Sequence, residues 1–508
     1  MAKTLLRGLS CAMVSTAVRA ETLQFSVLLH DEAGAPISAR VLVRDAAGRS
    51  HVPPVAVTSN LGPDTWFACD GRARLDVPAG TYDVRVEHGP EFRPQALTLA
   101  LDRNTTHEFR VARWIDLQAR GYRSGENHLH IPVGTLPAFM RAEGLDFGSS
   151  LSWWNGPYFS PPASDGPLAG RATWFDSEVE NDWGALYSIG LPRPMPVAWD
   201  PKRPNLAFAA AARDGGAVNC YQGGWSREAL LDALLGYVDV INIGDNLFHR
   251  FKFMPRTRYS NLLGVSGLPT YPATDQGMLQ LATESYYRLL NCGLHLAAGA
   301  GTAAGVKSSP AGYNRAYVKV GPDATVRDFL EAWRRGRNFV TNGPMLFLTA
   351  DTTHEPGDTL SLPAAGGEVR VRAEALSDQP LRSLTIVVNG RSLAQAAAGA
   401  GVVETTVRLT AGAWIAACAT AEDQSISEEE LGRFREESRL GGEAPSRLQF
   451  AHTSPIYVDV GGAGAHVPSS VAEARRMLDA FADFVHENAA PEFQAEMSSA
   501  IARARERL

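Results

Sequence analysis

The chain has 508 residues, a formal net charge of −7 and a charged fraction of 20%, which suits a globular protein of two to four domains. This balance excludes the basic footprint of a nucleic-acid-binding protein and the polybasic patch of a membrane-surface protein. No segment approaches the roughly 18 consecutive apolar residues of a membrane span, so we expect no membrane-spanning segment.

Residues 1–20 have features of a secretory signal peptide. Lys3 and Arg7 form a short positive start, a weakly apolar segment follows, and Val18-Arg19-Ala20 fits a small-residue cleavage site. We therefore expect a secreted or periplasmic protein, with the cytoplasm as the alternative location. The cysteines beyond this segment are too widely spaced to predict a disulfide framework.

Residues 21–113 are predicted to form a β-sandwich. The stretches LQFSVLLH and SARVLVRD alternate apolar and polar residues, which is the period-2 pattern of half-buried strands. The stretch GRARLDVPAGTYDVRVEHG predicts a hairpin. It resembles the small modules of the transthyretin and carboxypeptidase-regulatory type, which pack against or present a neighbouring domain.

The pattern changes over residues 114–350, where short apolar runs such as YVDVINIG alternate with helical stretches such as REALLDALL. This alternation predicts α/β layering, with a barrel-like sheet ringed by helices. Residues 351–465 return to β-alternation, interrupted by the acidic stretch SISEEELGRFREESR, which we expect to be solvated. Residues 466–508 are predicted to be helical.

The stretch GENHLHIP, residues 125–132, contains two histidines one residue apart. In an extended strand, residues i and i+2 point to the same face, so His128 and His130 would project two imidazoles toward one metal ion. The alternative is a strand whose outward face happens to carry two histidines. The motif falls near the end of the first strand of the α/β region, where barrel active sites form.

Several stretches resemble the CehA/McbA-like (carbaryl-hydrolase-like) branch of the PHP (polymerase and histidinol phosphatase) metallohydrolases. GYRSGENHLH resembles the family's opening motif, and FDSEVENDWGALYSIGL resembles its acidic motif. YYRLLNCGLHLAAGAGTAAGVKSSPAGYNRAYV and RRGRNFVTNGPML resemble its late signature. The resemblance implies a distorted PHP-like β/α barrel, a divalent metal at the strand ends and hydrolysis of an ester-type bond.

The same comparison of motifs shows departures from the family. Ala185, Tyr221 and Ala303 stand where the family has metal ligands, and no rotamer of alanine restores coordination. His128, His130 and Glu180 persist, with Glu178 as an alternative to Glu180. Two imidazoles and one carboxylate suffice for one divalent ion, such as zinc, manganese or iron, with open positions.

Other candidates follow from nearby stretches. In INIGDNLFH, Asp245 and His249 are possible replacement ligands; otherwise they belong to an ordinary loop, in which Asp245 and Asn246 form a turn. In SSPAGYNRAYV, Arg315 either clamps an anionic group of the substrate or bridges the barrel and a loop. The residues that we expect to contact substrate are Trp154, Tyr221, Asn314 and Arg315.

Two functions are consistent with these residues. The first is a metal-dependent hydrolase with about one metal ion per chain. In it His128 and His130 ligate the ion, Glu180 ligates it or acts as a base, and the substrate is a small molecule or polymer. The second is a catalytically inactive protein of the same fold that binds a glycan or surface polymer.

Overall fold

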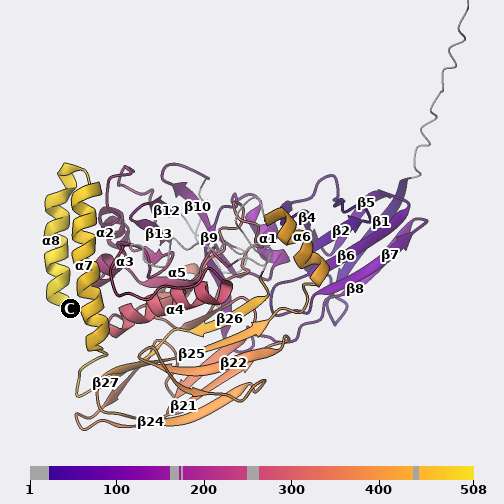
Figure 1. Cartoon of the computed structure of the whole chain (residues 1–508). Coiled ribbons are helices and arrows are strands. Elements are labelled where there is room, and N and C mark those ends of the chain that lie inside the picture. The colour runs from indigo at the N-terminus through magenta and orange to yellow at the C-terminus, as the bar shows by residue number, and fades with distance from the viewer. Residues whose placement is uncertain (1–21, 161–170, 173–174, 249–262, 439–445) are drawn as a thin grey trace, which may run out of the picture.

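The computed structural model of the protein describes residues 22–160, 171–172, 175–248, 263–438 and 446–508 (Figure 1). About 40% of these residues lie in strands and 21% in helices, so the protein is mostly β. Within these ranges no helix is long and apolar enough to cross a membrane. The expected signal peptide and His249 lie outside the described residues.

The first eight strands form two sheets that share one core, at the right of Figure 1. One sheet has the order β5-β1-β8 and the other has the order β3-β4-β2-β6-β7. Alternate residues of β1, including Phe25 and Val27, are fully buried between the sheets, as the period-2 pattern requires. The strands are β1 (Thr22–His30), β2 (Ser38–Asp45), β3 (Thr58–Leu61), β4 (Asp64–Asp70), β5 (Arg72–Pro78), β6 (Gly80–Glu87), β7 (Gln95–Leu101) and β8 (Thr105–Arg110).

The central region is built on a mixed sheet that continues into the C-terminal region. Its order is β16-β15-β14-β13-β12-β10-β9-β17-β18-β26-β25-β22-β23, with β11, β20 and β27 beside this path. The strands of the central region are β9 (Tyr122–Leu129), β10 (Phe147–Trp154), β11 (Arg171–Ala172), β12 (Asp176–Asn181), β13 (Gly184–Ile189), β14 (Val218–Tyr221), β15 (Val240–Gly244), β16 (Ala297–Ala300), β17 (Arg315–Lys319) and β18 (Asn338–Thr341).

The predicted α/β fold with a PHP-like β/α barrel is wrong. A β/α barrel needs neighbouring strands that run parallel. Here β13 pairs antiparallel with both β12 and β14, and β17 pairs antiparallel with both β9 and β18. Strand β18 then pairs with β26, so the ladder runs on into the C-terminal strands. The acidic stretch forms a hairpin that turns at 182–183, so the chain reverses there and β13 returns antiparallel to β12.

Helices cover the central sheet and, except for α1 (Leu136–Ala142), whose apolar side chains pack in a separate small cluster, bury their apolar faces in one large core with it. In Figure 1, α7 and α8 lie together at the end of the molecule opposite the first eight strands. Helix α4 begins at a side-chain cap, in which Thr274 accepts a hydrogen bond from Gly277 N–H (3.0 Å). The helices of this region are α1 (Leu136–Ala142), α2 (Leu206–Asp214), α3 (Ala229–Leu234), α4 (Asp275–Asn291), α5 (Val326–Arg334), α7 (Pro468–Asn488) and α8 (Pro491–Arg507).

The C-terminal strands form a second face-to-face packing. A three-stranded sheet of order β19-β21-β24 packs on the end of the long sheet, and alternate residues such as Val371 and Ile415 are fully buried between them. The strands are β19 (Met345–Ala350), β20 (Thr359–Leu362), β21 (Gly367–Leu376), β22 (Leu381–Val388), β23 (Arg391–Gln395), β24 (Val402–Leu409), β25 (Ala413–Glu422), β26 (Leu448–Thr453) and β27 (Ile456–Val460).

The acidic insert is not a solvated excursion. Its helix α6 (Glu428–Ser438) lies against the N-terminal sheets, as Figure 1 shows. Ile426 and Leu431 are buried in a small cluster with Leu42, Leu61 and Trp66 of the N-terminal strands. Ion pairs from Arg85 to Glu430 and from Arg433 to Asp64 surround this cluster. The composition suggested solvation because the stretch is strongly acidic, yet Ile426 and Leu431 pack against the N-terminal sheets.

Candidate metal centre

The backbone of β9 places the two histidines. His128 lies in the strand and His130 directly follows it. Ala303 N–H donates to His128 O and His130 N–H donates to Ala304 O, both at 2.8 Å, so the loop after β16 holds this segment extended. The predicted i, i+2 geometry results, with the two Nε2 atoms 2.9 Å apart.

Glu178 of β12 completes a group of three ligand atoms. Its Oε2 lies 3.3 Å from His128 Nε2 and 3.3 Å from His130 Nε2. A circle through three atoms at these separations has a radius of about 1.8 Å, just below the roughly 2.0–2.1 Å of a bond from zinc to nitrogen or oxygen. One divalent ion can therefore contact all three atoms, and this buried group could hold a metal ion.

The electrostatics of the group favour a cation. A carboxylate and the unprotonated nitrogen of an imidazole are acceptors, so these converging atoms need a cation or a proton between them. Burial raises the pKa of Glu178, but the charges and hydrogen bonds of His128 and His130 outweigh burial and lower it to about 2. Burial also lowers the pKa of His130. An ionised carboxylate and a neutral imidazole are the forms that bind metal.

Aromatic rings enclose the group. The ring of Tyr187 lies 4.3 Å from the ring of His128, and the rings of Trp154 and Tyr158 lie 4.5 Å and 5.7 Å from that of His130. Rings at these distances restrict solvent and hold the imidazoles in place. Trp154 therefore lies beside His130, and its expected contact with substrate stays a prediction. Tyr187 was not foreseen, and the stretch WGALYSIGL that contains it carries no signal beyond that of an ordinary buried strand.

Two glycines allow the loop after β16 to approach β9. A Cβ on Gly301 would lie 2.6 Å from His128 Cβ, and a Cβ on Gly305 would lie 2.0 Å from His130 O. Gly305 also has a φ of +104°, which L-residues rarely adopt. Glu126 links the strand to this loop, because its carboxylate accepts hydrogen bonds from the backbone N–H groups of Thr302 and Gly312. The loop and the strand therefore form one unit around the histidines.

Glu180 lies on the same face of β12 as Glu178 but further toward the rim. Its side chain is exposed and accepts a hydrogen bond from Trp154 Nε1 (3.1 Å). Burial against the rim and the charge of Glu178 raise the pKa of Glu180. Spacing could not choose between the two carboxylates because residues 178 and 180 share a face, so only the strand register shows that Glu178 meets the histidines.

Asp245 and Asn314 meet each other at the ends of β15 and β17. Asp245 is buried, its Oδ1 accepts a hydrogen bond from Leu247 N–H (2.8 Å), and burial raises its pKa to about 8. Asn314 donates to the backbone oxygens of Asp245 and Phe248. Neither belongs to the converging group of three ligands.

Tyr221 and Arg315 are buried structural residues in this structure. Tyr221 O–H donates to Asp232 Oδ2 at 2.6 Å. Arg315 is 1% exposed and donates to the backbone oxygens of Gly312 (2.5 Å) and Glu143 (3.0 Å). This arrangement is the bridge between a strand and loops that the sequence analysis gave as the alternative to an anion clamp.

A cleft with an empty volume of about 870 Å³ opens beside His130. One wall comes from the loop after β16, including Lys307, and the opposite wall comes from β3 of the N-terminal sheets, including Ser59 and Asn60. Of the three ligand residues, His130 lines the cleft, and its side chain is 1% exposed. The other lining residues carry mostly hydroxyl, amide and apolar groups.

Comparisons with known proteins add no functional assignment. No family model matches the chain, and no curated protein matches it. A crystal structure of β-glucuronidase from Parabacteroides merdae aligns with 83% of this chain at 11% identity and a TM-score of 0.17. A second structure of that enzyme, with glycerol in its active site, aligns with 84% of this chain at the same identity and TM-score. The chain spans 61% and 60% of the length of those two chains.

Proposed function

We propose that this protein is a metal-dependent hydrolase of ester-type bonds with a mononuclear site held by His128, His130 and Glu178. The observation that carries the proposal is the buried triangle of two imidazole nitrogens and one carboxylate oxygen, with sides of 2.9–3.3 Å. Motif similarity to CehA/McbA-like metallohydrolases around residues 125–130 and 176–180 supports it. The features of residues 1–20 support export as part of this proposal.

A divalent ion held there would supply Lewis acidity, polarising a carbonyl or phosphoryl oxygen and lowering the pKa of water toward about 7. Glu180 is the base that we assign, because its carboxylate stands at the rim two residues from the ligand Glu178. Partial burial and the charge of Glu178 raise the pKa of Glu180. Trp154 orients Glu180 through its indole N–H. Tyr158 and Tyr187 shield the imidazoles from bulk water.

The cleft beside His130 defines the substrate class of this proposal. Its hydroxyl and amide groups on β3 and the ammonium of Lys307 suit a polar small molecule or the end of a polymer that carries an ester-type bond. The bond to be cleaved would lie at the His130 end, and the remainder of the substrate would lie along β3. We therefore expect the N-terminal sheets to contribute to substrate choice.

Metal content tests the ligand set. We expect wild-type protein to retain about one divalent ion per chain and the double variant His128→Ala, His130→Ala to retain none, as measured by elemental analysis after gel filtration. The double variant His466→Ala, His486→Ala is the matched control, because it removes two exposed histidines. A folded wild-type protein that takes up no divalent ion would refute the proposal.

The two neighbouring glutamates separate binding from catalysis. Glu178→Gln should lose the metal, because it replaces a charged ligand with a neutral amide of the same shape. Glu180→Gln should keep the metal and lose hydrolysis by a factor of about 10²–10⁴, which is the usual contribution of a general base. A panel of nitrophenyl esters and phosphoesters provides the assay. Equal metal loss in both variants would remove Glu180 from the role of base.

A second function is favoured by one specific observation. Ala185 and Ala303 place methyl groups where the resembling family has ligands, and within the described ranges three ligand residues converge rather than a larger set. A catalytically inactive protein that binds a glycan or surface polymer would retain the cleft and lack turnover. Metal binding without hydrolysis of any ester in the panel, together with polymer binding, would establish this second function instead.

A further inference from the structure

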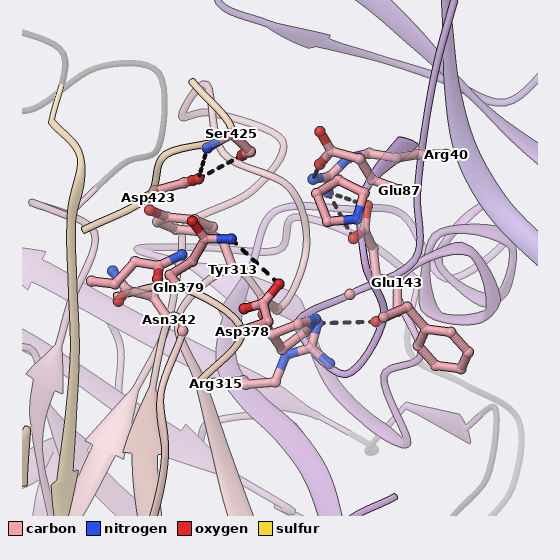
Figure 2. Close-up of a pocket in the computed structure, with 17 residues that line it drawn as sticks. Arg40, Glu87, Glu143, Tyr313, Arg315, Asn342, Asp378, Gln379, Asp423 and Ser425 are labelled. Atoms are coloured by element: carbon pink, nitrogen blue, oxygen red, sulfur yellow. Dashed lines mark hydrogen bonds and ion pairs between the residues drawn. The ribbon is translucent and has the colours of Figure 1, made fainter. Parts of the chain in front are cut away.

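A second pocket lies away from the histidine group, where the N-terminal sheets, the start of β17 and the turns of the C-terminal region meet (Figure 2). Its empty volume is about 600 Å³, which includes space open to solvent. The N-terminal sheets supply Arg40 and Glu87, the segment after β6 supplies Phe92, and the C-terminal turns supply Asp378 and Asp423. No residue of the converging metal group lines this pocket.

The two guanidinium groups of the pocket are already engaged. Arg40 donates to both carboxylate oxygens of Glu143 at 2.7 Å and also pairs with Glu87, as the dashed lines in Figure 2 show. Arg315 donates to backbone oxygens of two loops. Because these donors already have acceptors, the pocket is poorly suited to an anionic ligand.

The remaining polar lining consists mostly of acceptors. The lining side chains carry four carboxylates, from Glu87, Glu143, Asp378 and Asp423, against the two guanidinium groups, which gives a formal charge of −2. Asp378 lies in the turn between β21 and β22, and Asp423 directly follows β25, so two adjacent turns of the C-terminal region present carboxylates to one pocket. Asp423 already accepts hydrogen bonds from the N–H and O–H of Ser425, so it is the net negative charge of this side, not an unused acceptor, that would attract a cation.

Gln449 provides an independent indication of a ligand. This residue is 8% exposed, lines the pocket, and its Oε1 is buried without a hydrogen-bond partner in the described residues. A Cβ on the neighbouring Gly343 would lie 2.5 Å from that oxygen, so the glycine leaves the space that the amide occupies. A buried acceptor without a donor costs about 1–3 kcal/mol, and a ligand donor would remove this cost.

We propose that this pocket binds a small organic cation of amino-sugar size, with its ammonium group near Asp378 and Asp423. The volume is too large for a single metal ion, and the amides of Gln379, Asn342 and Gln449 can exchange hydrogen bonds with ligand hydroxyls. Phe92 and the adjacent prolines offer an apolar surface to the ring. A ligand in this position would contact all three regions of the chain at once.

Calorimetry with matched sugars tests the proposal. D-glucosamine carries the ammonium, whereas D-glucose and N-acetyl-D-glucosamine have the same ring without the charge. We expect D-glucosamine to bind at least tenfold more tightly than either neutral sugar. We also expect the same affinity in the variant His128→Ala, His130→Ala, which separates this site from the metal centre. Equal affinity for the three sugars, or no binding of D-glucosamine up to about 10 mM, would overturn the proposal.

Substitutions locate the binding. Asp378→Asn should weaken D-glucosamine binding at least tenfold, whereas Asp102→Asn, which changes an exposed carboxylate in the turn between β7 and β8, should leave it unchanged. Gln449→Met keeps the size of the side chain and removes the buried acceptor, so it should also weaken binding. Unchanged affinity in Asp378→Asn would refute the proposed position of the ammonium even if Gln449→Met failed to fold.

Discussion

Gly305 offers a direct test of how the loop after β16 supports the metal centre. A Cβ at this position would lie 2.0 Å from His130 O, about 1 Å closer than real Cβ contacts allow. In Gly305→Ala, His130 or the loop must therefore move by about 1 Å, because the obstacle is backbone rather than a flexible side chain. A ligand displaced by that distance leaves the roughly 2.0–2.1 Å reach of a metal bond. We expect metal affinity to fall at least tenfold.

Backbone strain in Gly305→Ala lowers the stability of the protein separately from any displacement of His130. A control variant with similar strain measures this loss. A φ of +104° at an L-residue costs of the order of 1–2 kcal/mol in stability, and Gly216→Ala has comparable strain at a φ of +81° with nothing within 4 Å of the added Cβ. Competition with a fluorescent zinc chelator measures the affinity, and urea unfolding measures the stability. If Gly305→Ala and Gly216→Ala bind zinc with equal affinity, the loop does not position His130 and our account of the site is wrong.

Three further predictions concern stability. Leu431→Ala should lower the free energy of unfolding by about 2–4 kcal/mol because Leu431 is buried against the N-terminal sheets; an equal loss in the exposed Leu97→Ala would contradict this. Burial lowers the pKa of His452 from 6.5 to about 4, so its contribution is fully present above pH 6.5 and is lost as the pH falls through about 4. The difference between these two pKa values corresponds to about 3 kcal/mol in the free energy of unfolding. His452→Gln should flatten urea-unfolding stability over that window by this amount, and an unchanged profile would refute the assignment. A chelator should lower the Tm of wild-type protein, by the equivalent of about 2.7 kcal/mol if the free metal is 100 times its Kd, and should leave the Tm of His128→Ala, His130→Ala unchanged.

Local patterns in the sequence predicted strands well and their partners poorly. Alternation identified β1 and β6 because one face of each is more buried than the other, which residue spacing reveals directly. It also identified β2, although Arg40 and Arg44 of that strand are buried as well. The barrel prediction failed because partner choice depends on turns and long-range contacts. The turn at 182–183 makes β12 and β13 antiparallel, and β18 pairs with β26, more than 100 residues later in the chain.

At the candidate site, too, the sequence predicted features within one strand but not those that depend on contacts between strands. The pair His128 and His130 followed from a two-residue spacing within one strand, and the structure places their Nε2 atoms together. The choice of Glu178 over Glu180 required the register of β12 against β10 and of β10 against β9, which spacing does not contain. Arg315 and Tyr221 were selected for chemistry that their buried hydrogen bonds now occupy, because a sequence does not show which polar groups already have partners.

The docking of α6 has a consequence for the order in which the chain folds. Trp66 and Leu42 belong to strands that emerge early in synthesis, yet their apolar neighbours Ile426 and Leu431 emerge more than 350 residues later. At about 5–20 residues per second, a ribosome needs on the order of 20–70 s to close that gap. During this interval the N-terminal sheets present a bare tryptophan-centred surface, to which chaperones or other nascent chains can bind before the segment that covers it exists.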